Sequence, residues 1–462
     1  MPAFQVLSAF NKSNEYHPLM QKEVKDKPKH AIVAAVQLPS VTDLEFNASL
    51  SELRELAKTL GYDVIQTFIQ KRAGFDMRAY LGTGKRQEIL EYLNHAPEAE
   101  HVEVLMVDHE ISPSQARNLE LEVACEVMDR TMVILEIFHR NARSRAARAQ
   151  VEIARLGYMA PRLREAAKLA GSQGRQRSGE GGRGAGESQT ELDKRKIRDR
   201  IAELQLEIVA MDAERKTQSA RRQERKGLTA VALVGYTNAG KSTLMRALTG
   251  SAVLVANKLF ATLDTTVRAL YPESVPRVLV SDTVGFIKNL PHGLVASFKS
   301  TLDEALDASL LLHVIDASDP GFERQLEVTD EVLAEIGADA VTRIRVFNKI
   351  DYISDVAERA EREAALREKY PDCVVMSARN PDDVAMLHHK IVTFFQRDLI
   401  ETEIFLPWTA QQVRGEIYAK CQVLEEHAEA EGAFFKVLCD AVVARNIRIQ
   451  LGQEKAPSLD DW

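Results

Sequence analysis

The chain has 462 residues, of which 45% are hydrophobic and 28% are charged, a composition typical of globular proteins and long enough for about three domains. Its four cysteines lie far apart without a CxxC pair, and no apolar run reaches the roughly 18 residues that span a bilayer; both facts argue against a disulfide framework, a zinc site and a membrane-inserted protein. The net charge is -8, yet residues 140–226 carry 22 Lys and Arg against 12 Asp and Glu, while the remaining chain carries 38 against 56.

The N-terminal third is predicted to be a tail followed by a small domain. Residues 1–30 have no apolar core behind a basic start, so we expect a flexible tail rather than a signal peptide. Short β-like runs at 31–38, 63–71, 102–108 and 125–137 alternate with helical patterns. Residues 31–138 are therefore predicted to form an α/β domain with a largely parallel sheet.

Residues 139–227 are predicted to form an antiparallel helical hairpin. A basic helical pattern from about 144 to 170 contains Pro161, which should kink or end the helix. The Gly- and Ser-rich stretch 171–190 predicts a flexible tip. The second helix carries a heptad seam at Ile197, Ile201, Leu204, Ile208 and Met211. A linker between unrelated domains is the alternative for the tip, and an ordinary solvated surface is the alternative for the basic face, which otherwise indicates a polyanionic partner.

The alternation of β-like runs and helices resumes over residues 228–400, followed by a small C-terminal module at 401–462 that carries no catalytic signal. The predicted fold class is therefore α/β. An N-terminal α/β domain and a helical hairpin precede a nucleotide-binding domain with a mostly parallel sheet, and a C-terminal α+β module ends the chain.

The stretch "VALVGYTNAGKSTL" contains GxxxxGKS between an apolar run and a helical pattern, the context that a phosphate-binding loop requires. Glycines let consecutive N–H groups face the phosphates at a helix N-terminus. Lys241 would reach the β- and γ-phosphates, and the Ser242 hydroxyl would ligate Mg2+. The predicted phosphate-binding residues are Gly235, Tyr236, Thr237, Asn238, Ala239, Gly240, Lys241, Ser242 and Thr243.

Two further segments are predicted to meet the γ-phosphate and the metal. In "FATLDTTVR", Thr262 is preferred over Thr265 and Thr266 as the threonine that closes on Mg2+. In "VLVSDTVGF", Asp282 ends an apolar run and can hold a water of the metal shell, and Gly285 offers its N–H to the γ-phosphate. The nucleotide-binding residues predicted here are Phe260, Ala261, Thr262, Leu263, Asp264, Asp282, Thr283, Val284 and Gly285. The catalytic candidates are Lys241, Thr262 and Gly285, and the metal ligands are Ser242 and Thr262.

The stretch "RVFNKID" predicts which base is bound. The Asp351 carboxylate can accept hydrogen bonds from N1–H and the 2-amino group of guanine, whereas adenine offers it neither donor. Asn348 can hold the base edge and the Lys349 stem can cover the base face. The predicted base-binding residues are Asn348, Lys349, Ile350 and Asp351, together with Ser377, Ala378 and Arg379 of "VVMSARN".

Phe286 follows Gly285 at the position where many GTP hydrolases have a glutamine that orients the attacking water. A phenyl ring can neither donate nor accept those hydrogen bonds. The sequence therefore predicts a hydrolase that binds GTP and turns it over slowly, with the missing group supplied or ordered by a partner. Simple packing of the ring beneath the neighbouring helix is the alternative.

Together these motifs resemble the HflX family of GTPases. The resemblance also covers "VDHEISPSQARNLE", "DRTMVILEIF", "AQVEIARLGYMAPRL", "LFATLD" and the run "DTVGFIKNLPHGLVASFKSTLDEALDASLLLHVIDASD". Family membership implies binding to the 50S ribosomal subunit, with the hairpin directed at the peptidyl-transferase region. It further implies action in ribosome dissociation, rescue or assembly, and a hydrophobic residue in place of the glutamine. The sequence departs from the family pattern at Ala146, Ala147 and Ala185, all in the segment expected to touch the ribosome.

The resulting hypothesis is a cytoplasmic, monomeric, Mg2+-dependent GTP hydrolase that contacts ribosomal RNA of the 50S subunit through its hairpin. Partial membrane association is included, without stable membrane insertion. An ATP- or GTP-dependent remodeller of ribosomal RNA is the alternative, and a membrane-associated, non-enzymatic regulator of a protease is a third possibility. Asp351 separates the first two, because only guanine recognition needs its carboxylate.

Overall fold

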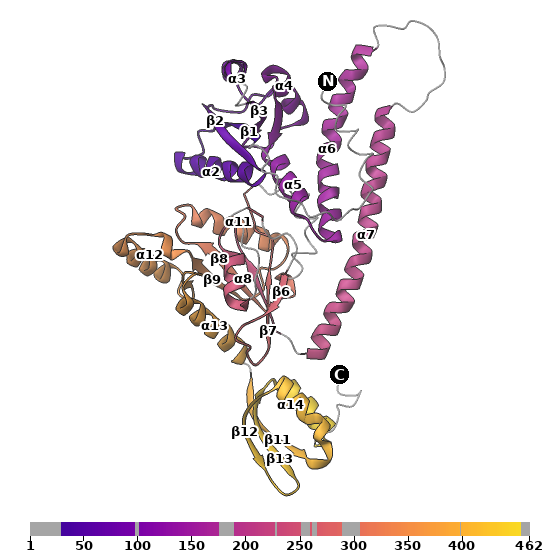
Figure 1. Ribbon diagram of the computed structural model, residues 1–462, viewed down its shortest axis with the longest axis vertical. Coiled ribbons are helices and arrows are strands. Elements are labelled where there is room, and N and C mark those ends of the chain that lie inside the picture. The colour runs from indigo at the N-terminus through magenta and orange to yellow at the C-terminus, as the bar shows by residue number, and fades with distance from the viewer. Residues whose placement is uncertain are drawn as a thin grey trace.

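The computed structural model describes residues 29–97, 101–174, 189–226, 229–250, 259–260, 266–288, 305–397 and 399–453. Three sheets follow one another along the long axis of the molecule, and a pair of long helices runs beside the first two (Figure 1). We refer to residues 29–141 as the N-terminal domain, 145–226 as the hairpin, 229–397 as the central domain and 399–453 as the C-terminal module. The predicted fold class, with two parallel-sheet domains, a hairpin and an α+β module, is confirmed.

The N-terminal domain is built on a parallel four-stranded sheet in the order β2-β1-β3-β4. Its strands are β1 (Lys29–Gln37), β2 (Tyr62–Lys71), β3 (Val102–Val107) and β4 (Glu126–Asp129). Its helices are α2 (Asp43–Thr59), α3 (Thr83–His95), α4 (Pro113–Val123) and α5 (Arg130–Asn141). Every residue of β1 from Ala31 onward is buried, because apolar clusters pack on both faces of the sheet.

Two sequence predictions for this domain are wrong. Residues 125–137 are not one strand, because β4 ends at Asp129 and helix α5 begins at the next residue. The Asp129 carboxylate accepts the N–H of Met132 at 2.9 Å and so caps the helix. The β-branched residues that favoured a strand instead lie on the buried face of α5. The predicted tail of residues 1–30 is too long, because Lys29 and His30 already belong to β1.

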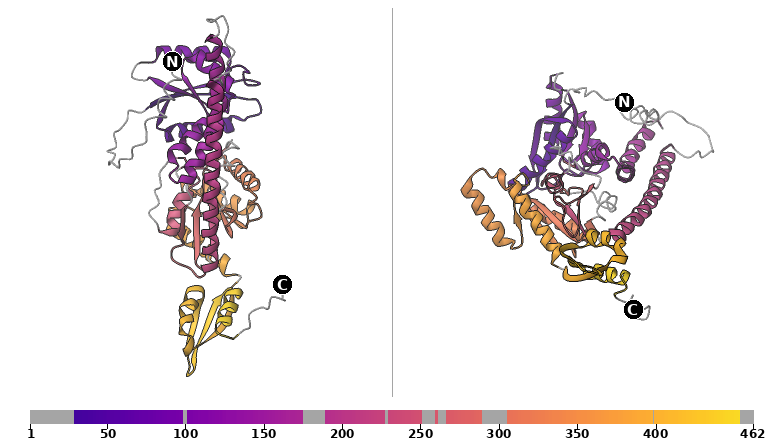
Figure 2. Two further views of the ribbon diagram at one scale, coloured as in Figure 1. Left: turned by 90° about the vertical axis from the view of Figure 1, so that its right-hand side faces the viewer. Right: turned by 60° about the horizontal axis from the view of Figure 1, so that its bottom comes forward.

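The hairpin consists of α6 (Arg145–Gly174) and α7 (Gln189–Lys226), which lie side by side (Figure 1 and the right-hand view of Figure 2). Both helices extend into the predicted tip, and Pro161 does not end α6. Residues 175–188 of the tip, Ala185 included, lie outside the described residues. The predicted seam faces inward, with Leu204 only 3% exposed and its four partners half-buried. Arg200 on α7 bonds to Glu152 on α6 at 3.1 Å.

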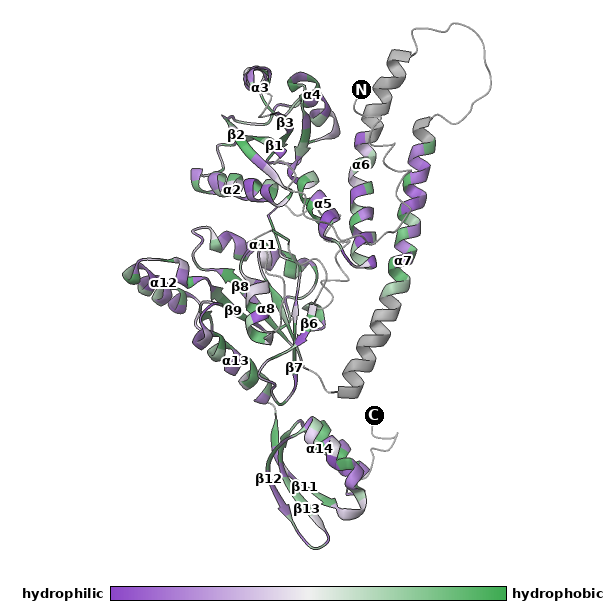
Figure 3. Cartoon of the chain, in the orientation of Figure 1, coloured by the Kyte–Doolittle hydropathy of each residue, from purple (hydrophilic) through white to green (hydrophobic). Residues whose placement is uncertain are grey.

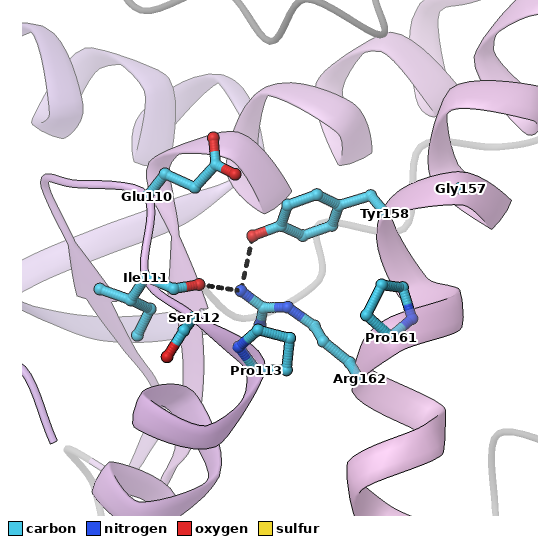
Figure 4. A pocket seen from close by; sticks show the side chains of 8 residues that line it. All are labelled: Glu110, Ile111, Ser112, Pro113, Gly157, Tyr158, Pro161 and Arg162. Atoms are coloured by element: carbon cyan, nitrogen blue, oxygen red, sulfur yellow. Dashed lines mark hydrogen bonds between the residues drawn. The ribbon is translucent and has the colours of Figure 1, made fainter. Parts of the chain in front are cut away.

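The middle of α6 is attached to the N-terminal domain. The Arg162 guanidinium donates to the Asp129 carboxylate at 2.7 Å and to the Tyr158 hydroxyl at 2.5 Å. Tyr158 is hydrogen-bonded to Asp129 as well. A cavity of about 460 Å³ lies beside these contacts, between α6 and the loop that precedes α4 (Figure 4). These contacts therefore hold α6 against the N-terminal domain part-way along the hairpin.

The central domain has a six-stranded sheet in the order β10-β9-β8-β5-β7-β6, parallel except for β6 at one edge. Its strands are β5 (Thr229–Val234), β6 (Thr266–Ala269), β7 (Val278–Asp282), β8 (Leu310–Asp316), β9 (Arg343–Asn348) and β10 (Val374–Val375). Its helices are α8 (Lys241–Thr249), α11 (Phe322–Glu335), α12 (Val356–Lys369) and α13 (Pro381–Gln396), with a short 3-10 turn, η3 (Ile350–Tyr352). Apolar residues concentrate in these strands, while α7 is mostly hydrophilic where its residues are coloured (Figure 3).

The C-terminal module is an antiparallel sheet in the order β11-β13-β12 with helices on one face. Its elements are β11 (Ile400–Pro407), η4 (Trp408–Val413), α14 (Arg414–Lys420), β12 (Gln422–Ala428), β13 (Gly432–Cys439) and α15 (Ala441–Gln450). Within the ranges that the structure describes, we find no helix with both the length and the apolar content that a membrane span requires.

Candidate nucleotide site

Most of the predicted site residues that the structure describes lie at the carboxyl edge of the central sheet. Because β5, β7, β8 and β9 are parallel neighbours, the loops that follow them meet at one edge. The phosphate loop follows β5, Asp282 ends β7 and Asn348 ends β9. Such an edge is where ligands bind in open α/β sheets.

Two glycines of the phosphate loop have conformations and neighbours that exclude side chains. Gly235 has φ +146°, and a Cβ there would lie 2.2 Å from the carbonyl oxygen of Val314. Gly240 has φ +100° at the start of α8, and its Cβ would lie 2.2 Å from Nδ2 of Asn348. Asn238 also has a positive φ and is exposed at the loop apex. The loop can therefore curl over the N-terminus of α8, where backbone N–H groups favour anions.

Lys241 is the first residue of α8 and is 7% exposed. Its ammonium donates to the carbonyl oxygens of Gly235 at 3.0 Å and Tyr236 at 2.7 Å. Burial lowers the pKa of Lys241 to about 8, while the nearby Asp282 carboxylate favours the charged form. Two N–H groups are thus used to hold the loop, and the ammonium sits at the centre of the site.

Ser242 and Asp282 lie together as oxygen donors. The Ser242 hydroxyl donates to Oδ2 of Asp282 at 2.8 Å, and Asp282 is buried at the end of β7. Hydroxyl and carboxylate oxygens suit Mg2+. Thr243 follows on α8 and is half-buried. Thr262, the other predicted metal ligand, lies outside the described residues, as do Ala261, Leu263 and Asp264.

The segment after Asp282 packs directly on the phosphate loop. The Thr283 hydroxyl donates to the carbonyl of Leu233 at 2.7 Å, and Val284 is buried. A Cβ on Gly285 would lie 3.0 Å from the Lys241 ammonium nitrogen and 2.9 Å from Cγ2 of Thr237. A side chain at residue 285 would therefore obstruct the space beside the lysine, in agreement with the predicted approach of its backbone N–H to the γ-phosphate.

Phe286 is 1% exposed and belongs to an apolar core shared by the N-terminal and central domains. Its backbone pairs with the phosphate loop: its N–H donates to the Gly235 carbonyl at 3.1 Å, and its carbonyl accepts the N–H of Thr237 at 2.7 Å. The ring is thus withdrawn into the protein.

The Tyr236 hydroxyl links this segment to the N-terminal domain. It accepts the backbone N–H of Lys288 at 2.8 Å and lies close to the Glu52 carboxylate of α2. Burial, and then the Glu52 carboxylate, raises the pKa of Tyr236. Glu52 is also paired with buried Arg130, whose guanidinium donates to Asp108 at 2.9 Å. No sequence pattern indicates this link, because its members are far apart in the chain.

A second link between the domains involves Phe260. Its ring centroid lies 4.6 Å from that of Phe138, and its carbonyl accepts from Nδ2 of Asn141 at 3.0 Å. The sequence predicts that Phe260 binds nucleotide, but the described contacts of this buried residue are with α5. Its φ of +55° is unusual for a side chain of this size.

The Asn348 side chain, at the end of β9, joins two loops at the edge of the sheet. Its Nδ2 donates to the Ala239 carbonyl at 2.9 Å, and its Oδ1 accepts the N–H of Ala378 at 2.9 Å. The amide therefore joins the phosphate loop to the loop after β10. Ile350 packs beneath this edge, whereas Asp351 is exposed on η3, where its carboxylate is accessible to a base.

Ser377, Ala378 and Arg379 complete the pocket. The N–H of Ser377 donates to Asp383 at 2.8 Å, and its hydroxyl accepts the N–H of Arg379 at 3.2 Å. Ser377 and Ala378 are buried, and their N–H groups are engaged by Asp383 and Asn348. The Arg379 guanidinium lies 5.2 Å from the ring centroid of Tyr352. Tyr352 and Asp316, which contacts Lys349, are not among the predicted residues, although Asp316 ends a strand at this same edge.

Comparison with known proteins agrees with this geometry. Three family profiles match the chain, described as "GTP-binding GTPase N-terminal" (residues 47–139), "GTP-binding GTPase Middle Region" (141–222) and "50S ribosome-binding GTPase" (230–349). The chain is 50% identical to GTPase HflX of Gluconacetobacter diazotrophicus over 447 residues, which cover 90% of this chain and 96% of that protein. It is 36% identical to GTPase HflX of Escherichia coli over 409 residues, which cover 88% and 92%.

A solved structure described as the complex of SsGBP with GDP matches 80% of this chain and 99% of its own, at 24% identity and a TM-score of 0.46. The identities to GTPase HflX proteins extend over nearly the full length, and the profiles cover all three segments up to residue 349. The chain therefore belongs to the HflX family and is a P-loop GTPase that hydrolyses GTP.

Proposed function

We propose that this GTPase binds the 50S ribosomal subunit and acts in ribosome dissociation, rescue or assembly, with slow intrinsic hydrolysis that the subunit stimulates. The observation that carries the proposal is the buried position of Phe286, beside a complete phosphate loop and guanine pocket. Such a site can bind GTP, but residue 286 provides no side chain that orients water. A partner is then needed for efficient turnover. In the GTPase Ras, a partner protein that completes the active site from outside raises the rate of GTP hydrolysis by about 10^5-fold.

The hairpin supports a polyanionic partner. It spans most of the segment in which Lys and Arg outnumber Asp and Glu by 22 to 12, within a chain of net charge -8. Its seam residues face inward, which leaves basic residues such as Lys196 and Arg198 exposed on α7. The central domain matches a profile described as "50S ribosome-binding GTPase", which supports ribosomal RNA as the polyanion. Ala146 and Ala147, which depart from the family pattern, are buried at the base of α6 rather than presented to a partner.

We assign Mg2+ to the Ser242 hydroxyl and, through water of its shell, to Asp282, with Thr262 as the closing ligand. When bound, Mg2+ neutralises charge on the β- and γ-phosphates. Lys241 holds the phosphate loop and contributes a second positive charge, and the backbone N–H of Gly285 orients the γ-phosphate. Asn348 fixes the pocket while Asp351 selects guanine.

GTP turnover with and without purified 50S subunits tests the proposal. We expect at least a tenfold stimulation, which the double variant Lys196→Glu/Arg198→Glu on α7 reduces. The matched control is Arg367→Glu/Lys369→Glu on α12, which makes the same change of charge on an exposed helix of the central domain. Equal turnover with and without subunits would overturn the proposal. Equal loss in both double variants would show that overall charge, rather than the hairpin, mediates binding.

A remodeller of ribosomal RNA driven by ATP or GTP is the second candidate. The exposed carboxylate of Asp351 beside the pocket favours a guanine-specific enzyme instead. Unwinding of a ribosomal RNA duplex that ATP supports as well as GTP, and that persists in Asp351→Ala, would favour the remodeller.

A further inference from the structure

Lys349 has an unusual and well-fixed position at the guanine pocket. It follows β9 with φ +63°, a left-handed conformation that lysine rarely adopts. Its side chain passes the start of α8, where a Cβ on Gly240 would lie 4.0 Å from Cε of Lys349. The ammonium then ends 2.8 Å from Oδ2 of Asp316. The two side chains are only 18% and 15% exposed, so the ion pair is weakly screened.

Asp316 is itself held from two directions. It is the last residue of β8 and lies opposite Asn348 in the parallel pairing with β9. Its other oxygen, Oδ1, accepts the N–H of Ser318 at 3.0 Å and the Ser318 hydroxyl at 2.6 Å. Both carboxylate oxygens are therefore engaged, and the carboxylate is a fixed point rather than a mobile counter-ion.

Tyr352 lies beside the same ammonium. The Lys349 ammonium nitrogen is 5.8 Å from the Tyr352 ring centroid, and the Arg379 guanidinium is 5.2 Å from it. Two cations thus approach one ring within the range of a cation–π interaction. The lysine head is held on the Asp316 side of the pocket, and its methylene stem is left along the wall between the head and Gly240.

We propose that Asp316 is a positioning residue for guanine nucleotides, which acts by anchoring the Lys349 ammonium so that the lysine stem lies across the face of the base. Lysine loses much side-chain entropy when it is immobilised. An anchor present before the nucleotide arrives removes that cost from binding. Without the anchor, the free ammonium would be drawn towards the phosphates, and the stem would leave the base. The inference rests on the assignment of Lys349 to the base face, which the experiment tests separately.

Dissociation of fluorescently labelled GDP measures the effect, in the full-length chain with Asp316→Asn, Lys349→Met and both changes together. Asp316→Asn keeps an oxygen for Ser318 but turns an uncharged group towards Lys349. Lys349→Met keeps an apolar stem without the charge. We expect Asp316→Asn to accelerate GDP dissociation about tenfold in the natural chain and less than twofold in the Lys349→Met background. Asp319→Asn, in the same loop but bonded to Gly321 and Gln325, should leave dissociation unchanged.

A comparison of GDP with inosine diphosphate separates positioning from base selection. Guanine and hypoxanthine, the base of inosine, present the same ring face to the lysine stem. Hypoxanthine lacks the 2-amino group from which the Asp351 carboxylate would accept a hydrogen bond. Asp316→Asn should therefore lower the affinities for both nucleotides by the same factor and leave the ratio of the two affinities unchanged. A selective loss of GDP would overturn the inference, because Asp316 would then act through Asp351.

The remaining outcomes also discriminate. An effect of Asp316→Asn that persists fully in the Lys349→Met background would show a role in the loop alone and overturn the inference. The inference is equally overturned if Asp316→Asn is silent while Lys349→Met weakens GDP. Lys349→Ala, which removes the stem as well as the charge, tests the assignment to the base face separately. If it leaves GDP dissociation unchanged, Lys349 does not cover the base, and the proposed anchoring fails with it.

Discussion

The guanine pocket and the segment after Asp282 are both attached to the phosphate loop, but they are anchored in different ways. The pocket is held entirely within the central domain: Asn348 joins Ala239 to Ala378, and Asp316 holds Lys349. The segment around Phe286 is held from outside, since its ring lies in a core shared with the N-terminal domain and the Tyr236 hydroxyl reaches Glu52.

This difference separates nucleotide affinity from control of hydrolysis. The proposed base pocket is built from strand ends of one sheet, so changes in the N-terminal domain should leave base binding intact. The position of Gly285 and Phe286 depends on two domains, one of which contacts the hairpin through Arg162 and Asp129. A force on the hairpin therefore has a covalent and a packed route to the segment that we propose lies beside the γ-phosphate.

The largest expected effect is that of Lys241→Ala, which removes the group that both regions share. Hydrogen bonds from a charged group contribute about 1.5–3 kcal/mol each, so the loss of two contacts with the phosphates should lower the affinity for GTP by about 10^2–10^4-fold. The free energy of unfolding of the nucleotide-free protein should not fall, because the variant removes a buried charge. Titration calorimetry and urea unfolding measure both; a variant that binds GTP normally would contradict the phosphate-loop assignment.

Asp351→Ala should affect only the pocket. The carboxylate would accept two hydrogen bonds from guanine, so GTP affinity should fall by about 10^2-fold or more while the weak affinity for ATP stays the same. Because Asp351 is exposed on η3, the melting temperature should not change. Competition binding with GTP and ATP gives the ratio. A ratio equal to that of the natural chain would refute guanine selection by this residue.

Paired truncations of two buried phenylalanines test the separation directly. Phe286→Ala and Phe347→Ala each remove a fully buried ring, and each should lower the free energy of unfolding by about 3–5 kcal/mol. Phe347 precedes Asn348, and its carbonyl accepts the N–H of Met376 at 2.9 Å. Loss of the Phe347 ring should therefore also lower the affinity for GDP by about tenfold. Phe286→Ala should change GDP affinity less than threefold. Equal losses of GDP affinity would show that the two regions are not independent.

Strand-end reasoning from the sequence predicts the positions of Asp282, Asn348 and Ser377, because parallel strands bring their carboxyl ends together. The heptad seam likewise predicts which face of α7 is buried. The same strand-end rule, applied to the run "LLLHVID", points to Asp316, which is absent from the predicted site. The prediction for residues 125–137 is wrong because a short β-branched run does not distinguish a buried helix from a strand. The packing of Phe286 against the N-terminal domain leaves no local pattern, since contacts between domains have no fixed spacing.

The smallest expected effect is a proton linkage at Lys241. Burial lowers its pKa to about 8 in the nucleotide-free protein, and bound phosphate should raise it again. Binding of GDP should therefore take up almost no proton at pH 7 and close to one at pH 9, and the apparent affinity should decline above pH 8. Calorimetry in two buffers that differ in ionisation enthalpy measures the uptake. Lys241→Arg is the control, because arginine stays charged and should take up no proton.

The same shift predicts the pH dependence of stability. The folded pKa lies below the unfolded value of 10.5, so between about pH 8 and 10.5 the unfolded chain binds more protons at this residue than the folded chain does. The contribution of Lys241 to the free energy of unfolding should therefore rise with pH across that window, and saturating GDP should abolish the rise. If Lys241→Arg leaves this part of the stability profile of the nucleotide-free protein unchanged, the lysine is charged throughout the window. Its two carbonyl partners and Asp282 would then favour the charged form more than burial disfavours it.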